Sequence, residues 1–190
     1  MPHTTWQSGT TIQGPVYLDS NLLVGFVVRG HPIYENSAAL IGELLASQMT
    51  IFVSLLAVQE ALWAIAKLSY VELSNQRSNA HFSQSLYNRW LDRIISAHGA
   101  RFTAIGSMIR AWSEAGVPVE VVPKETAQFI ESLELTPEYM RQLKLTPADA
   151  AHLAVAKTHA KTLATADQPL AIASGKIDLG GLEVLLVTAR

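Results

Sequence analysis

The sequence predicts an α/β fold with a five-stranded parallel sheet flanked by helices, and with extra helices inserted between the second and third strands. Three observations lead to this prediction. The 190 residues are 49% hydrophobic and only 16% charged, short apolar runs alternate with longer amphipathic stretches, and glycine, proline or polar capping residues separate them. Such a composition buries a sizeable core and excludes a disordered chain. Strands that alternate with helices favour parallel pairing through right-handed crossovers.

The expected strands are short apolar runs bounded by polar or turn residues, at 16–18, 51–53, 117–122, 162–164 and 182–187. Apolar side chains at helical spacing predict the helices, at about 22–28, 34–47, 55–73, 74–98, 102–115, 124–133, 137–143 and 147–160. The sequence Leu-Thr-Pro occurs twice, at 135–137 and 145–147. Threonine caps helices and proline favours the first helical position, so each copy predicts a helix start.

Residues 1–14 are expected to be a flexible lead-in and residues 15–190 a single domain, with a helical insertion at about 70–112. The first residues have neither the basic nor the apolar region of a secretory signal. Every apolar run is broken well short of the ~18–20 residues that a spanning helix needs. We therefore expect a cytoplasmic protein without membrane contact. The absence of cysteine excludes disulfides and thiolate chemistry.

Charge is distributed unevenly, although the net charge is only −2. Arginines dominate residues 70–112 (Arg77, Arg89, Arg93, Arg101 and Arg110), and glutamates dominate residues 113–140. Two interpretations stay open: a field that guides an anionic substrate to one side of the molecule, or two solvated helical faces. The inserted helices would form either a dimer surface or an RNA-contacting flap, with Arg89 and Arg93 as the candidate contacts in the second case.

Four carboxylates follow the expected strands or lie in the helices after them. Asp19 directly follows the first strand, and Asp167 follows the fourth. Glu60 lies six residues beyond the helix start at Ser54, or ~9 Å along the helix axis. Asp149 lies in the first turn of the helix that begins after Thr146. Because parallel sheets bind ligands at the carboxyl ends of their strands, we expect the four acids to converge at one edge.

Closely packed carboxylates raise one another's pKa unless a cation lies among them. Oxygen ligands without cysteine or paired histidines favour Mg²⁺ or Mn²⁺ over zinc. Such an ion can hold a phosphodiester, activate water and offset charge on the leaving oxygen. The pattern therefore predicts a nuclease site.

Each acid also has a purely structural interpretation. Asp19 is a candidate helix cap, and Glu60 a candidate exposed helix residue, since an unpaired carboxylate among its apolar neighbours would be costly. Thr146-Pro147-Ala148-Asp149 matches a capping box, which explains Asp149 without a metal. Asp167 is a candidate turn residue. His152, one helical turn from Asp149, is expected to be packed or hydrogen-bonded, and the tryptophans are expected in core or dimer contacts rather than as base-stacking platforms.

Together, these segments resemble the PIN-domain ribonuclease family, which includes VapC-type toxins. The matching stretches are VYLDSN (16–21), SLLAVQE (54–60), LTPADAAHLAVA (145–156) and LATAD (163–167). The third is the most specific, because it is close to the family's D-A-x-H-x-A pattern. The resemblance spans roughly residues 16 to 187.

The resemblance implies a five-stranded parallel sheet, Mg²⁺ or Mn²⁺ as cofactor, and hydrolysis of RNA by a metal-activated water. It implies that Asp19, Glu60, Asp149 and Asp167 are the catalytic, metal-binding acids, and that Ser20, Asn21 and Thr165 are supporting polar groups. It also implies partners: RNA, an antitoxin protein and a second copy of the chain.

Two features depart from the family pattern. Glu60 and Asp149 are 89 residues apart, longer than in compact toxins, and the surplus falls in the arginine-containing helical stretch. After Asp167 the family often has another acid and an aromatic residue, whereas this chain has Gln168, Pro169 and Leu170.

Three functions are consistent with these observations. The first is a metal-dependent endoribonuclease, for example the toxin of a toxin–antitoxin pair. The second is a catalytically silent PIN-like module that binds RNA or protein, which the altered segment after Asp167 favours. The third is a small-molecule phosphatase with Asp19 as nucleophile, although such enzymes commonly need a second acid where this chain has Asn21.

Overall fold

The computed structural model describes residues 3–75 and 82–189, and every structural statement below refers to these residues. Within them, six strands form one fully parallel sheet in the order β1-β6-β5-β2-β3-β4. The strands are β1 (Thr4–Thr5), β2 (Val16–Leu18), β3 (Ile51–Ser54), β4 (Val119–Val122), β5 (Thr162–Thr165) and β6 (Glu183–Leu186). The helices are α1 (Ser20–Val27), α2 (Tyr34–Ala46), α3 (Leu55–Ser74), α4 (Gln84–Glu114), α5 (Thr126–Leu143), α6 (Pro147–His159) and α7 (Gln168–Ser174).

The predicted α/β fold with a parallel sheet flanked by helices is confirmed, but the sheet has six strands where the sequence predicts five. The additional strand, β1, lies inside the predicted lead-in. Thr4 and Thr5 pair with Leu185 and Leu186 of β6, and Trp6 is only 4% exposed. The prediction of a flexible lead-in is therefore wrong at residues 4–6. A strand of two residues shows no alternation of apolar and polar side chains, and its partner β6 lies at the other end of the chain. The sequence near residue 4 therefore does not indicate a strand.

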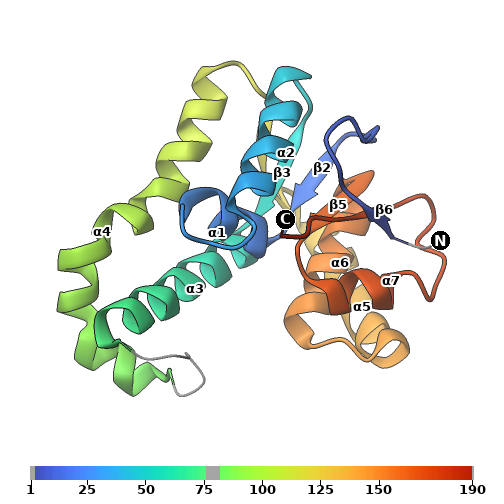
Figure 1. Ribbon diagram of the computed structural model, residues 1–190. Helices are drawn as coiled ribbons and strands as arrows, with labels where there is room; N and C mark the ends of the chain where they lie inside the picture. Colours follow the sequence, from blue (N-terminus) through green and yellow to red (C-terminus); the bar gives the residue numbers. More distant parts are fainter. Residues whose placement is uncertain (1–2, 76–81, 190) are drawn as a thin grey trace.

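The two faces of the sheet are covered by different helices (Figure 1). Val16 and Leu18 of β2 pack in a cluster with α1, α2, α3 and α4. Tyr17, between them, belongs to a second cluster formed with α5, α6 and α7. Successive residues of a strand point to opposite faces, and all three are fully buried, as is typical of a central parallel strand.

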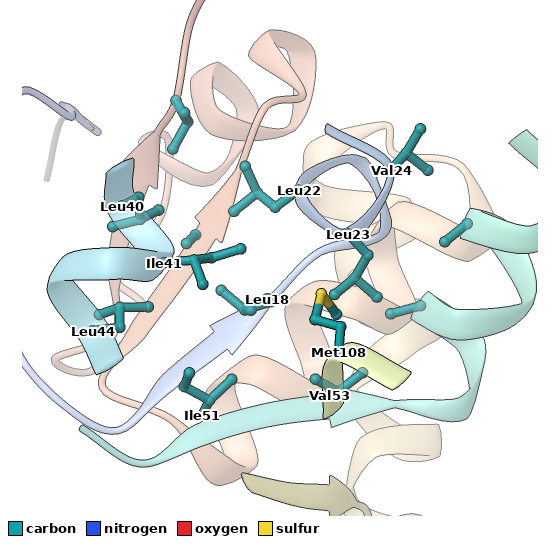
Figure 2. Packing of buried hydrophobic residues seen from close by; sticks show 14 of the residues in the cluster. Leu18, Leu22, Leu23, Val24, Leu40, Ile41, Leu44, Ile51, Val53 and Met108 are labelled. Carbon is teal, nitrogen blue, oxygen red and sulfur yellow. The ribbon is translucent and has the colours of Figure 1, made fainter. Parts of the chain in front are cut away.

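Helix α1 is anchored on the sheet by its apolar residues. Leu22 and Leu23 face the cluster formed by β2, β3 and the neighbouring helices, as Figure 2 shows together with Leu18, Ile41 and Met108. Leu22 and Leu23 are fully buried. Because α1 follows β2 after a single residue, this packing fixes the position of Asp19 at the end of the strand.

Several predicted helix boundaries differ from the structure. The helix predicted over 74–98 begins at Gln84 as α4, and residues 76–81 of that prediction lie outside the described residues. The predicted helices at 124–133 and 137–143 are one helix, α5, which contains Pro137. The Thr136 hydroxyl donates to the Ser132 carbonyl at 2.8 Å and does not cap a new helix, while Tyr139 and Leu143 pack in the cluster shared with α6. This packing outweighs the helical hydrogen bond that a proline removes. The predicted break near residue 98 appears as a non-helical residue, His98, within α4.

Helices α3 and α4 lie between β3 and β4, where the sequence predicts extra helices. Figure 1 shows α3 extending away from the sheet, and α4 beginning near the far end of α3 and running back past it. Tyr70 of α3 meets Trp90 of α4 with ring centroids 5.4 Å apart. None of the helices in the described part of the chain is long and apolar enough to cross a membrane.

The strand order reverses at β2. The chain moves from β2 to β3 and β4 on one side, and then to β5 and β6 on the other. Such a reversal opens a crevice at the carboxyl ends of the two strands that flank it. Asp19 follows β2 and Thr165 ends β5, so both lie at the crevice.

Candidate metal centre

Asp19 is buried at the carboxyl end of β2, with an exposed fraction of 2%. It is the N-cap of α1: its Oδ1 accepts from the Ser20 N–H at 2.6 Å. Its Oδ2 accepts from the Thr165 hydroxyl at 2.6 Å and from the Asn21 amide at 3.3 Å. The structure therefore brings Ser20, Asn21 and Thr165 to Asp19 as hydrogen-bond donors, and Asp19 both caps a helix and faces the crevice.

Glu60 reaches the same place from α3. Its Oε2 lies 2.6 Å from the Nε2 atom of His152 on α6, and that nitrogen is 3.5 Å from Asp19 Oδ1. One oxygen of each acid and one nitrogen of His152 all lie within 4.8 Å of one another. The Glu60 side chain is 32% exposed and His152 is almost fully buried, so the cluster opens to solvent on the Glu60 side.

The second ring nitrogen of His152 is hydrogen-bonded to Tyr17, and Tyr17 to Ser54. The sequence does not predict this role for either residue. The Nδ1 atom of His152 lies 2.7 Å from the Tyr17 hydroxyl, which lies 2.6 Å from the Ser54 hydroxyl. Ser54 in turn accepts from the Ala57 N–H at 3.0 Å as the N-cap of α3. The prediction of a packed, hydrogen-bonded His152 is confirmed, but one of its hydrogen-bond partners is Glu60, a candidate metal ligand. Tyr17 gives no sequence signal, because it reads as one apolar residue of a buried strand.

The electrostatics of the pair Glu60–His152 favour its charged form. The hydrogen bond to His152 lowers the pKa of Glu60, although partial burial opposes this, and a hydrogen bond from Ser20 helps. Burial alone would lower the pKa of His152, but the hydrogen bond to Glu60 and the charges of Asp19, Glu60 and Asp149 together raise it. An opposite charge nearby favours ionisation of both partners. Protonated His152 thus supplies the positive charge beside the two acids in the metal-free protein.

Asp149 and Asp167 border this cluster without joining its tightest part. Thr146 caps α6 by accepting from the Asp149 N–H at 3.2 Å, and its hydroxyl donates to Asp149 Oδ2 at 2.6 Å. Asp167 caps α7 through the Leu170 N–H at 2.7 Å. Burial raises the pKa of Asp167, and the charges of Asp149 and Asp19 add to the effect. Asp167 is thus a helix cap and Asp149 a partner of the cap Thr146, and the charge of Asp149 acts on both His152 and Asp167.

The arginines proposed as substrate contacts lie on the first half of α4. Arg89 and Arg93 are exposed, and the Arg93 guanidinium lies 5.0 Å from the centre of the Trp90 ring. Trp112 is buried and meets Phe26 edge-on, as expected for a core residue. Arg77 lies outside the described residues.

The donor set fits a divalent cation. Two carboxylate oxygens and one imidazole nitrogen are ligand types that Mn²⁺ and other first-row transition ions accept, and Mg²⁺ is satisfied by the carboxylates and water. Thr165, Ser20 and Asn21 orient Asp19, as residues around metal ligands commonly do. Asp19 and Glu60 are the residues that would hold such an ion.

Without a divalent ion, the stability of the protein is expected to depend on pH through this pair. The pKa of His152 is raised above its usual 6.5 and that of Glu60 is lowered below its usual 4.5. The contribution of His152 to the free energy of unfolding is complete below pH 6.5 and is lost as pH rises through the folded pKa of His152. The contribution of Glu60 is lost as pH falls through the folded pKa of Glu60. The pair therefore contributes most between about pH 4.5 and 6.5.

The measurement is the melting temperature in EDTA from pH 4 to 9, for the unmodified protein and for His152→Gln. We expect the difference between the two proteins to be largest near pH 5.5 and to shrink above pH 7. A difference that grows above pH 7 would show that His152 is stabilised in its neutral form, contrary to this account.

No family model and no curated relative matches the chain. Among solved structures, a crystal structure of VapBC2 from Rickettsia felis bound to a DNA fragment from its promoter is similar to it. The match covers 93% of this chain and 100% of that chain, with 18% identity and a TM-score of 0.44. Because both the identity and the TM-score are low, the candidate site is argued only from the distances and contacts described above.

Proposed function

We propose that this protein is a divalent-metal-dependent endoribonuclease, built as one PIN-like domain that also includes β1. The observation that supports the proposal is the convergence of Asp19 and Glu60 beside His152, within 4.8 Å, at the carboxyl edge of a parallel sheet. These groups come from three different elements, and their meeting leaves two carboxylates that a cation would balance. Asp149 and Asp167, at the border of the cluster, are the further candidate ligands.

When bound, a divalent ion supplies the Lewis acidity that polarises a phosphodiester and activates water. The residues of the chain orient and charge the groups that would hold the ion. Hydrogen bonds from Ser20, Asn21 and Thr165 fix the orientation of the Asp19 carboxylate. Glu60 remains ionised because its pKa is lowered. Its partial exposure lets an RNA phosphate approach from solvent. No side chain acts as a nucleophile, so no covalent enzyme intermediate is expected.

The experiment is cleavage of a labelled RNA pool by the purified protein with Mg²⁺ or Mn²⁺, and then with excess EDTA. We expect cleavage with either ion, its loss in EDTA and its return when the ion is restored. Cleavage that continues in excess EDTA would contradict the proposal, and so would the absence of cleavage with both ions.

A second candidate function is a catalytically silent PIN-like module that binds RNA or protein. The environment of Asp167 favours it, since burial raises the pKa of this carboxyl group. A carboxyl group that holds its proton more firmly competes less well for a metal ion. Isothermal titration with Mn²⁺ separates the two functions, because a silent module takes up no metal.

We place the ribonuclease in the cytoplasm, as the toxin of a toxin–antitoxin pair. The resemblance of segments 16–21 and 145–156 to VapC-type toxins motivates this. Production in a bacterial host is expected to arrest growth, and joint production of the protein from the adjacent gene is expected to restore it. Unchanged growth with an active enzyme would show that the protein is not a toxin.

Reversing two charges on α4 is expected to weaken RNA binding if the inserted helices contact RNA. The double variant Arg89→Glu, Arg93→Glu removes two exposed cations, and each phosphate contact to single-stranded RNA contributes about 0.7 to the slope of log affinity against log salt. We expect the slope to decrease by about 1.4, measured by fluorescence anisotropy from 50 to 300 mM salt.

The matched control is Lys161→Glu, Lys176→Glu, which also reverses two exposed cations. Lys161 precedes β5, at the end of the sheet opposite the metal centre. An equal change of slope in both double variants would refute a specific role of α4.

We propose that a second copy of the chain covers an apolar groove beside the site. The groove has a volume of about 300 Å³ and lies between β4, α5 and the start of α3. Leu55, Val121, Phe129 and Leu133 line it and are 47–69% exposed. Contiguous apolar surface of this kind commonly marks an interface.

Light scattering at several protein concentrations is expected to show a dimer for the unmodified chain and a monomer for Phe129→Glu, Leu133→Glu. Ile172→Glu is the control, because Ile172 is also exposed but lies on α7, outside the groove. A monomeric unmodified protein would contradict the proposal, as would a double variant that remains dimeric.

A further inference from the structure

His152 occupies the place that a metal ligand would take, although the resemblance to PIN domains assigns the metal to acids alone. Its Nε2 atom faces both carboxylates, at 2.6 Å from Glu60 and 3.5 Å from Asp19. The ring is only 1% exposed, so water does not reach it from other directions. An ion held by the two acids would therefore lie next to this nitrogen.

The other ring nitrogen is fixed in the way that is common for metal-binding histidines. Such histidines use the second nitrogen to hydrogen-bond a neighbouring group, which sets the tautomer and the ring orientation. Here Nδ1 meets the Tyr17 hydroxyl at 2.7 Å, and Tyr17 is itself fully buried and bonded to Ser54 at 2.6 Å. A metal ion would take the place of the Nε2 proton that bonds Glu60 in the metal-free protein. With Nδ1–H donating to Tyr17 and Tyr17 donating to Ser54, the Nε2 atom then presents its lone pair to the ion between the two acids.

We propose that His152 is a nitrogen ligand of the metal site, held in position by Tyr17 and Ser54, and that the site prefers Mn²⁺ to Mg²⁺. The inference rests on the metal site of the proposed function. Imidazole suits transition ions, whereas Mg²⁺ selects oxygen ligands and keeps its water. A set of two carboxylates and one imidazole thus discriminates between two ions that an all-carboxylate site binds similarly.

The test is Mn²⁺ binding to the whole protein, followed by electron paramagnetic resonance without RNA. The signal of free Mn²⁺ gives the dissociation constant, and electron spin-echo modulation from nitrogen-14 reports a coordinated imidazole. We expect one Mn²⁺ ion with nitrogen modulation, and displacement only by at least a tenfold higher concentration of Mg²⁺. Asp19→Asn is expected to abolish this binding, which assigns the ion to the site.

Three variants distinguish a ligand from a structural residue, and circular dichroism checks that each is folded. His152→Gln is expected to remove the nitrogen modulation and weaken Mn²⁺ binding by about 100-fold, but to leave Mg²⁺ binding nearly unchanged. Tyr17→Phe keeps the ring and removes only the partner of Nδ1, so a loss of about 10- to 100-fold with the modulation retained is expected. His159→Gln, at the other end of α6, is the control and should change neither.

Each outcome decides the question. Mn²⁺ bound at Asp19 without nitrogen modulation would overturn the role of His152 and leave the proposed nuclease intact. Tighter Mn²⁺ binding by His152→Gln would also overturn it, because His152 would then be a competing positive charge. Failure of the unmodified protein to bind Mn²⁺ or Mg²⁺ would overturn both this inference and the proposed function.

Discussion

The substitution Asp19→Asn is expected to reduce RNA cleavage by about a thousandfold, since a catalytic metal contributes several kcal/mol to transition-state stabilisation. Asparagine has nearly the shape of aspartate but lacks its charge. Asp19 is 2% exposed and its carboxylate is fixed by donors from Ser20, Asn21 and Thr165, so the substitution removes a charge from a fixed position. The measurement is the initial rate of cleavage of a defined RNA at saturating Mn²⁺.

Asp92→Asn is the matched control, because Asp92 is exposed on α4 and its loss should leave the rate unchanged. Circular dichroism must show that the Asp19→Asn protein is folded. If folded Asp19→Asn cleaved RNA as fast as the unmodified protein, the catalytic centre would lie elsewhere.

The largest expected effect on stability is that of Leu23→Ala, with a loss of about 2–5 kcal/mol in the free energy of unfolding. Leu23 is fully buried where α1 packs against the sheet (Figure 2). Truncation removes buried methyl groups and leaves a cavity that the close-packed surroundings fill only in part. Urea denaturation followed by fluorescence gives the free energy.

Ile172→Ala truncates an aliphatic side chain of the same size that is 48% exposed and lies outside the apolar groove, and its effect should stay within about 0.5 kcal/mol. Because α1 begins at Ser20, directly after Asp19, loosening α1 should also weaken metal binding in Leu23→Ala. Equal stability of the two variants would mean that α1 is not anchored as described.

The central sheet could be predicted from the sequence because its strands are short, apolar and bounded by caps. The segment 16–18 is both a predicted strand and β2, and Thr146 is a predicted cap that accepts from the Asp149 N–H. These features depend on neighbouring residues alone. β1 could not be predicted, because its two threonines form a strand only through pairing with β6 at the other end of the chain.

Local rules failed where packing between distant segments decides the outcome. Thr136 and Pro137 have the same local sequence as Thr146 and Pro147, yet only the second pair begins a helix. The difference is that α5 continues to pack against α6 on both sides of Pro137. A pattern within a few residues contains no information about such a neighbour.

The candidate site shows the same limit. Asp19 and Glu60 were predicted from their places after strands, and the structure brings them together. His152 was expected to be hydrogen-bonded, but its contact with Glu60 joins residues 92 positions apart, which no spacing rule reveals. The structure places Asp149 and Asp167 at the border of the cluster, where Asp149 accepts from the capping residue Thr146 and Asp167 caps α7.

The most direct test is a crystal structure of the protein soaked in Mn²⁺, with anomalous scattering used to locate the ion. We expect one strong anomalous peak in contact with Asp19 and Glu60, with His152 Nε2 in the coordination shell. An empty centre at millimolar Mn²⁺, or an ion bound only at other residues, would contradict the account.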